Sequence, residues 1–407
     1  MVLKTLKIND FIQYKKPLID MTINIVANAV PILVIQMAIF PLLSLHMGEE
    51  DYGLFLTLVA MLNTVPAGFG NVLNNIRLIF EKKYIDSNLG TDFPLLLVLF
   101  QLLSFLLVVS STVYFTKSTE FLLYILLTFT SVTWLAREYY IVAFRLTINY
   151  RAIFIANILT VVGYIVGYLI FLQTEAWYWI YILGNVFSLI YILLNCRLLS
   201  EALQKTNLFK YILGQSLLLL AAGFVGKLLM YADKFMLYPL LGGALVSVYY
   251  VSTLSGKIIT LIIGPVSGVM LTYLSKMKKN DKMFEQILTV SALLCLLGYI
   301  FGVVVSEPVL RLLYPGFAER ALKYIYITTA AAVISAFYSI INPFIMNFFE
   351  MKWQLVISAG TVVAYVLISL LFLKQWGLLG FCYGVLITNI IRVISGVVIY
   401  YRADKVT

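Results

Sequence analysis

The chain has 407 residues, of which 62% are hydrophobic and 12% charged, with a formal net charge of +10 and a mean hydropathy of +0.97. An average soluble domain is about 45–50% apolar and about 25% charged, so this composition excludes a soluble globular protein. Only helices and closed barrels satisfy the backbone inside a bilayer, and long apolar runs such as 94–115 lack the alternating pattern of a barrel. We therefore predict an all-α integral membrane protein.

Apolar runs of roughly 20 or more residues, each long enough to span a bilayer, occur about twelve times. In chain order they lie near 17–44, 52–80, 93–115, 120–144, 150–172, 177–199, 208–237, 244–275, 284–305, 321–349, 353–373 and 377–401. The connections between them are short and leave no room for a soluble catalytic domain.

Basic residues in the connections and at the ends of these spans gather on one side of the membrane. With the amino terminus placed inside, 18 Lys and Arg residues fall in inner segments and 5 in outer segments. Because positive charge marks the cytoplasmic side, both termini are predicted to be cytoplasmic. The positive net charge is thus explained by the orientation of the protein in the membrane. We predict membrane lipids, and no nucleic acid, as its partners.

Short motifs of the first two spans recur in spans seven and eight at an offset near 198 to 199. The matched pairs are Phe40-Pro41 with Tyr238-Pro239, Tyr52 with Tyr249-Tyr250, Pro66 with Pro265 and Gly70 with Gly268. A repeat after an even number of spans keeps the same topology. We therefore predict two six-helix lobes, 1–205 and 206–407, related by a pseudo-two-fold axis along the membrane normal.

Six basic residues lie inside the predicted spans and at least three residues from a span end, where a charge is costly and needs a partner, water or a role. They are Arg77, Arg137, Lys227, Lys234, Lys257 and Arg392. Only Glu138 and Asp233 are acidic residues well within spans, so the surplus charge is positive. This balance predicts a water-filled cationic cavity for an anionic substrate such as a diphosphate.

Polar residues that share helix faces with these charges complete the predicted substrate site. Its candidates are Lys227, Lys257, Arg77, Arg137, Arg392, Tyr250, Thr253 and Asn74. Structural alternatives stay open for each charge. Arg77 and Arg392 can snorkel to the cytoplasmic interface, Arg137 can pair with Glu81 or Glu138, and Lys227 and Lys257 can belong to buried ion pairs. Lys234 is expected near the outer interface, in contact with solvent.

No constellation typical of an enzyme appears, and we predict no cofactor and no metal. The three cysteines stand in separate apolar stretches, and His46 is the single histidine. No phosphate-binding loop of an ATPase is present. Transport would then draw on an ion gradient, the membrane potential or the substrate gradient. Glu138 and Asp233 are the candidates for proton or sodium coupling, with a purely structural role as the alternative.

The segment from Pro41 to Phe55 contains Gly48, Tyr52 and Gly53 in a pattern that resembles the "P-x-x-x-x-x-L-G-x-x-x-Y-G-x-F" segment of bacterial polysaccharide flippases. These are the O-antigen and capsule repeat-unit translocases of the multidrug/oligosaccharidyl-lipid/polysaccharide exporter superfamily. Further matches are Gly68-Phe69-Gly70, Arg77, Asp233-Lys234, the 243–249 region and Trp376-Gly377-Leu378-Leu379-Gly380. The first span has no basic residue after Lys16, which departs from related lipid-precursor flippases.

The resemblance implies a transporter with two six-helix lobes in the bacterial cytoplasmic membrane. It implies an undecaprenyl-diphosphate-linked oligosaccharide as substrate, flipped to the outer leaflet by alternating access. It also implies a cationic central cavity for the diphosphate, a monomeric protein, and a polysaccharide polymerase with its chain-length machinery as partners. Because the first span lacks a basic residue, Arg77 or Arg137 would have to supply the first lobe's share of the anion site.

Two other functions compete with this one. A cation-coupled multidrug exporter of the same superfamily should have an acidic pore, and the six basic in-span residues disfavour it. A membrane glycan polymerase or glycosyltransferase usually needs a sizeable outer loop with acid and base residues. The largest outer segment, 306–320, is thin for that role.

Overall fold

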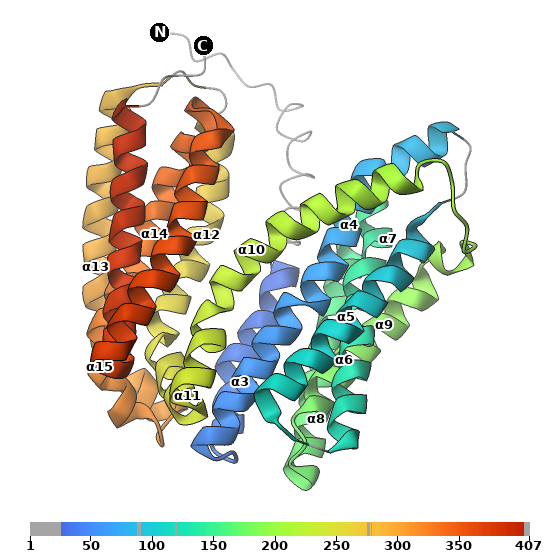
Figure 1. Cartoon of the computed structure of the whole chain (residues 1–407), viewed down its shortest axis with the longest axis horizontal. Helices are drawn as coiled ribbons and strands as arrows, with labels where there is room; N and C mark the ends of the chain where they lie inside the picture. The colour runs from blue at the N-terminus through green and yellow to red at the C-terminus, as the bar shows by residue number, and fades with distance from the viewer. Residues whose placement is uncertain (1–25, 88–90, 119, 275–276, 278, 403–407) are drawn as a thin grey trace, which may run out of the picture. The chain divides into compact units, whose positions relative to one another are not determined.

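The computed structural model describes residues 26–87, 91–118, 120–274, 277 and 279–402, and each regular element among them is a helix (Figure 1). Ten helical segments in these ranges are long and apolar enough to cross a membrane. The predicted all-α, multi-pass membrane protein is therefore confirmed. The amino-terminal lysines at positions 4, 7, 15 and 16 lie outside the described residues.

The chain divides into two compact units, and unit 1 consists of Met1–His46 and Leu54–Pro239. A helical segment, Val26–Ser44, opens it and contains the π-helix η1 and the short α2. The elements that follow in chain order are α3 (Glu49–Thr64), α4 (Pro66–Ser87), α5 (Phe93–Thr116), α6 (Phe121–Tyr140), α7 (Val142–Leu146), α8 (Tyr150–Thr174), α9 (Tyr178–Asn195), the 3-10 turn η2 (Leu198–Ser200) and α10 (Phe209–Leu241).

Close helix packing in unit 1 depends on small residues. Helix α6 packs against α4, α5 and α9, and α8 lies along α9. A Cβ atom at Gly163 or Gly167 of α8 would collide with the backbone of α9, so these two glycines let the helices touch. Their four-residue spacing is the small-residue motif that membrane helices use for close approach.

A proline separates α3 from α4. Pro66 begins α4 directly after Thr64 and Val65. Because proline has no N–H and its ring clashes with the preceding turn, it interrupts the helix at this point. The Pro66 kink positions the start of α4, which carries Gly68 and Asn71, beside the end of α3.

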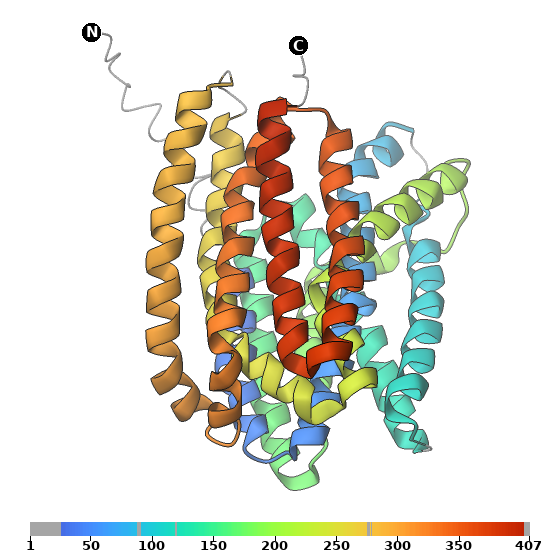
Figure 2. The same ribbon diagram turned by 60° about the vertical axis from the view of Figure 1, so that its left-hand side comes forward.

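Unit 2 consists of Met47–Gly53 and Leu240–Thr407. Its helices are α11 (Gly243–Ser252), α12 (Leu254–Leu274), α13 (Asp281–Leu313), α14 (Ala318–Phe348) and α15 (Met351–Arg402). Helix α14 packs against the other four, which can be followed in Figure 2. A core of aromatic residues, including Phe284, Phe344 and Tyr400, joins α13, α14 and α15.

The predicted spans follow the observed helices closely. Helix α15 is interrupted by non-helical backbone at Trp376 and Gly377, where Gly377 has a positive φ of 57° that favours glycine. This break separates the two predicted spans 353–373 and 377–401. The predicted span 244–275 corresponds to α11 and α12.

One pair of residues matched by the predicted repeat, Tyr52 and Tyr250, is in contact in unit 2. The rings of Tyr52 and Tyr250, at the offset of 198, have centroids 6.3 Å apart. Nearby, the hydroxyl of Ser247, which is not one of the matched residues, donates to the carbonyl oxygen of Glu49 at 2.8 Å. The side chains at 265 and 268, also part of the repeat, lie outside the described residues. The repeat, the lobe boundary at 205/206 and the orientation of the termini stay predictions.

Candidate functional site

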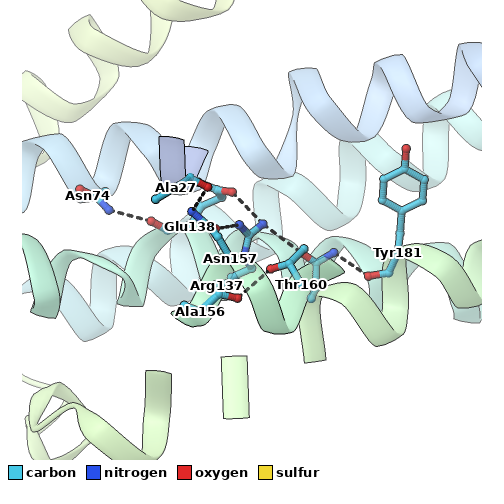
Figure 3. A network of polar contacts seen from close by, with 9 residues as sticks. Ala27, Asn74, Arg137, Glu138, Ala156, Asn157, Thr160 and Tyr181 are labelled. Atoms are coloured by element: carbon cyan, nitrogen blue, oxygen red, sulfur yellow. Dashed lines mark hydrogen bonds and ion pairs between the residues drawn. The ribbon is translucent and has the colours of Figure 1, made fainter. Parts of the chain in front are cut away.

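Arg137 lies in a buried polar network of unit 1 (Figure 3). Its Nη1 donates to Glu138 Oε1 at 3.2 Å and to Asn185 Oδ1 at 3.4 Å, and its Nη2 donates to Asn157 Oδ1 at 3.1 Å. These partners come from α6, α9 and α8, so one guanidinium connects three helices. The pairing of Arg137 with Glu138, one of the two alternatives from the sequence, is confirmed.

The two asparagines of this network are also engaged at their other ends. Asn157 Nδ2 donates to the carbonyl oxygen of Ala27 at 3.0 Å (Figure 3). Asn185 Nδ2 donates to the carbonyl oxygen of Tyr181 at 2.8 Å. Both Nη atoms of Arg137 and both carboxamides thus have partners, whereas the buried Arg137 Nε has none among the described residues. Buried polar networks stabilise one arrangement through the hydrogen bonds that they do make. The Arg137 network therefore has the geometry of a structural clamp.

Asn74 belongs to the same region of unit 1 and is 2% exposed. Its Nδ2 donates to the backbone carbonyl of Glu138 at 2.8 Å, and its Oδ1 accepts from Arg145 Nη1 at 2.5 Å. Because both ends of the carboxamide are engaged, Asn74 fixes α4 against α6 and α7.

Arg77 on α4 is buried among acidic and aromatic groups. Its Nη1 and Nη2 donate to the two carboxylate oxygens of Glu201 at 2.8 and 2.5 Å, and Glu81 forms a second ion pair with it. The Phe93 ring lies 4.7 Å from the guanidinium carbon. Glu201 also accepts from the Thr91 hydroxyl at 2.8 Å. The guanidinium is thus held inside the protein, in a fork geometry that matches a carboxylate.

Lys234 is 7% exposed and pairs with Asp233 at 2.9 Å. The prediction that Lys234 is solvated is wrong, because neighbouring residues of the protein cover it. Asp233 and Glu138, the two candidates for cation coupling, thus each accept from a neighbouring basic residue.

Lys227 on α10 differs from the other three in-span basic residues of unit 1. It lies beside a cavity of about 70 Å³ between α3, α4 and α10. No carboxylate among the described residues forms an ion pair with it. The cavity is lined by Thr64, Gly68, Asn71, Val72, Leu220, Gly223, Phe224 and Lys227. The lining contains no acidic residue, so the ammonium group gives the cavity a positive charge.

In unit 2 the predicted basic residues lie over aromatic rings. Lys257 Nζ is 3.3 Å from the centroid of the Tyr250 ring, and the Arg392 guanidinium carbon is 4.1 Å from that of Tyr338. Such contacts are favourable for a cation, most of all when it is desolvated. Lys257 and Tyr250 share a face as the helical spacing predicted. The hydroxyl of Thr253 donates to the Tyr250 carbonyl oxygen at 2.8 Å, at the break between α11 and α12.

Tyr314 lies beside this group, in the turn between α13 and α14. Its ring centroid is 6.5 Å from that of Tyr250. Burial raises the pKa of the Tyr314 hydroxyl well above its usual range, so this group stays neutral beside Tyr250 at physiological pH.

The structure therefore divides the predicted site residues by unit. Unit 1 holds Arg77, Arg137, Asn74 and Lys227, and unit 2 holds Lys257, Tyr250, Thr253 and Arg392. Within unit 1, Arg137 and Asn74 meet through Glu138, and Lys227 lines a separate cavity. Within the described part of the chain, no cluster of three or more His, Cys, Asp or Glu side chains is placed to hold a metal ion.

Sequence reasoning missed several polar partners. Asn157 and Asn185 lie inside predicted spans, where a polar side chain is costly, so both could have been predicted to have polar partners. Glu201 lies in a connection and is 124 residues from Arg77, and nothing in the local pattern points to it. Asn71 carried no charge to distinguish it from Asn74 and Asn75 on the same helix.

Comparison with known proteins identifies the fold and leaves the family open. No protein-family model matches the sequence. No curated protein matches it either. The structure is similar to that of the lipid II flippase MurJ in an inward closed conformation, with a TM-score of 0.67 and 12% identity, covering 94% of this chain and 85% of that chain.

Two transporter structures of a second kind are also similar. An inward-facing multidrug resistance MATE family transporter of the MOP superfamily has a TM-score of 0.59 and 15% identity, over 93% of this chain and 98% of that chain. A MATE crystal structure in the bent conformation has a TM-score of 0.56 and 15% identity, over 93% and 92%. The chain has the fold of these transporters. Because one fold supports different functions, the substrate has to be argued from the site.

Proposed function

We propose that this chain is a transporter that flips a lipid-linked oligosaccharide carrying a diphosphate across the bacterial cytoplasmic membrane. The substrate moves from the inner to the outer leaflet by alternating access, and both termini are cytoplasmic. The resemblance to polysaccharide flippases names the substrate as an undecaprenyl-diphosphate-linked repeat unit. The similarity to a lipid II flippase supports a lipid-linked substrate.

The observation that carries this proposal is the charge of Lys227. Arg77, Arg137 and Lys234 are each matched by a carboxylate within unit 1. Lys227 instead faces a cavity without an acidic residue in its lining. An intramembrane charge without a structural partner is best explained by a functional partner, here an anion.

The same observation disfavours a multidrug exporter for cationic compounds. A pore for cations needs an acidic residue that faces the substrate. The two in-span acids of unit 1, Glu138 and Asp233, each pair with a basic side chain. The similarity to MATE transporters supports the fold equally well, so this alternative is one of the outcomes of the experiment below.

The experiment is deletion of the gene in its native host, followed by complementation. We expect the deletion to abolish surface polysaccharide and to cause lipid-linked repeat units to accumulate at the inner leaflet. Wild-type protein and Lys210→Ala, an exposed position on the same helix as Lys227, should restore export. Lys227→Ala should accumulate in the membrane and fail to restore it. Normal polysaccharide with increased drug sensitivity in the deletion strain would instead indicate the exporter.

A further inference from the structure

The connection between α9 and α10 is fixed to the rest of unit 1 at two points. Glu201, near its start, accepts from the hydroxyl of Thr91 at 2.8 Å. Thr206, near its end, donates to Asp92 through both its backbone N–H and its hydroxyl, each at 2.5 Å. We call these two attachments, at Glu201 and at Asp92, the connection anchor.

The connection anchor forces the residues between its two points to loop outward. Thr91 and Asp92 are neighbours in the chain, so their Cα atoms are about 3.8 Å apart. The residues that they hold, Glu201 and Thr206, are separated by four others. All four, 202–205, are exposed, and the side chain of Leu203 is 68% exposed. The protein thus orders a short loop whose own side chains face away from it.

The basic side chains of this connection are exposed, whereas its acidic side chain is turned inward. Arg197 and Lys205 are exposed, and neither forms an ion pair with a described residue. Glu201 is the one acidic residue between positions 194 and 211, and both its carboxylate oxygens accept from Arg77. Asp92 is 0% exposed. The anchor therefore uses its carboxylates inside the protein and leaves an outer face with positive charge.

This positive face lies where a chain leaves the bilayer. Helix α9 ends at Asn195 and α10 begins at Phe209, and both helices are long and apolar enough to cross a membrane. The connection also exposes Leu199, which is 54% exposed, besides Leu203. Basic residues interspersed with exposed leucines are typical of a segment that lies in the headgroup region. The predicted orientation places this segment on the cytoplasmic side.

We infer that residues 197–205 form a binding site for anionic phospholipid of the inner leaflet. Arg197 and Lys205 supply the charge for the headgroup phosphate, and Leu199 and Leu203 contact the acyl chains. The connection anchor holds these side chains in place. The site is separate from the Lys227 cavity, and the inference does not depend on which substrate the protein transports.

The test is binding of phosphatidylglycerol to the purified full-length protein, measured by native mass spectrometry, with zwitterionic phosphatidylcholine as the comparison. Arg197→Gln and Lys205→Gln should each weaken phosphatidylglycerol binding roughly fivefold and together roughly thirtyfold, which is typical for basic residues near an anionic surface. Lys117→Gln removes the same charge at the other end of α5 from Asp92 and should bind as the wild type does. Equal phosphatidylglycerol binding by the wild type and the double variant would contradict the inference.

Asp92→Asn separates an anchored site from a general attraction, because the two predict changes of opposite sign. The substitution makes the protein more positive by one charge, so a general attraction to anionic lipid would become stronger. It also removes a carboxylate that accepts from Thr206, so the inference predicts weaker binding, toward that of the double variant. If Asp92→Asn does not fold, Thr206→Val removes one donor at constant charge and should weaken binding in the same direction. Unchanged or stronger binding by the folded variant would overturn the inference.

Competition identifies the source of the anion. Glycerol phosphate carries the phosphate without acyl chains, so an excess of it should displace little phosphatidylglycerol from the wild type. Complete displacement would mean that the segment binds a soluble phosphate, and the inference would be wrong. It would also be wrong if the double variant binds lipid normally but supports less polysaccharide export in cells, since the segment would then serve an acidic protein partner.

Discussion

Unit 1 contains two kinds of intramembrane charge, and the Arg137 network and the Lys227 cavity represent them. Arg137 is 9% exposed and is held by oxygens from three helices, in contact with a carboxylate. Lys227 lies on the same scaffold, beside open space and no acidic residue. Both charges are costly in a bilayer, but only the first is compensated by the protein itself. The difference separates a residue that stabilises the fold from one that is available to a substrate.

The largest expected effect comes from replacing Arg137, whose charge is paired with Glu138 inside the protein. Arg137→Met should lower the free energy of unfolding by about 4 kcal/mol, because it leaves Glu138 without its partner and two carboxamide oxygens without their donor. Thermal unfolding in detergent measures this change. Lys227→Met is the matched control and should unfold at or slightly above the wild-type temperature. An equal loss of unfolding free energy in the two variants would contradict the difference between the Arg137 network and the Lys227 cavity.

A comparison of two glycines sharpens the same contrast. Gly70→Val should lower the free energy of unfolding by about 3 kcal/mol, since its side chain would overlap the backbone of α6. Gly68→Val, two residues earlier and facing the cavity, should change it by less than about 1 kcal/mol. Chemical denaturation of both purified variants measures their free energies of unfolding. A large loss at Gly68 would mean that the cavity is filled in the folded protein.

The ion pair between Arg77 and Glu201 should contribute less. Glu201→Gln keeps the shape of the side chain but removes its charge, and should cost about 1.5 kcal/mol because Glu201 is 20% exposed and Glu81 still pairs with Arg77. Glu120→Gln, an exposed glutamate without a described ion pair, should have little effect. If the two variants unfold at the same temperature, the ion pair between Arg77 and Glu201 does not stabilise the fold.

Much of this architecture could be predicted because lipid is a demanding solvent. Apolar runs must be helices, so the spans and even the break at 376–377 follow from hydropathy and turn residues. Charges inside spans are rare and costly, so Arg137 and Lys227 were identifiable as candidates. The partner of Arg137 is its neighbour Glu138, which local reasoning could reach.

The parts that escaped prediction depend on tertiary contacts. Glu201 reaches Arg77 from a connection far along the chain, and no periodicity encodes that contact. Lys234 is covered by packing that its position near a helix end did not reveal. The cavity itself arises from missing side chains at Gly68 and Gly223, and a glycine in a sequence does not say whether it permits contact or leaves space.

The central claim is that Lys227 holds an anionic lipid-linked substrate and the paired charges of unit 1 do not. The most direct test reconstitutes the purified protein into liposomes and measures the initial rate at which undecaprenyl-diphosphate-linked sugar crosses the bilayer. We predict that Lys227→Ala abolishes this movement without lowering the unfolding temperature, that Lys227→Arg retains part of it, and that Lys210→Ala moves substrate at the wild-type rate. Movement at the wild-type rate by the Lys227→Ala protein would contradict the account.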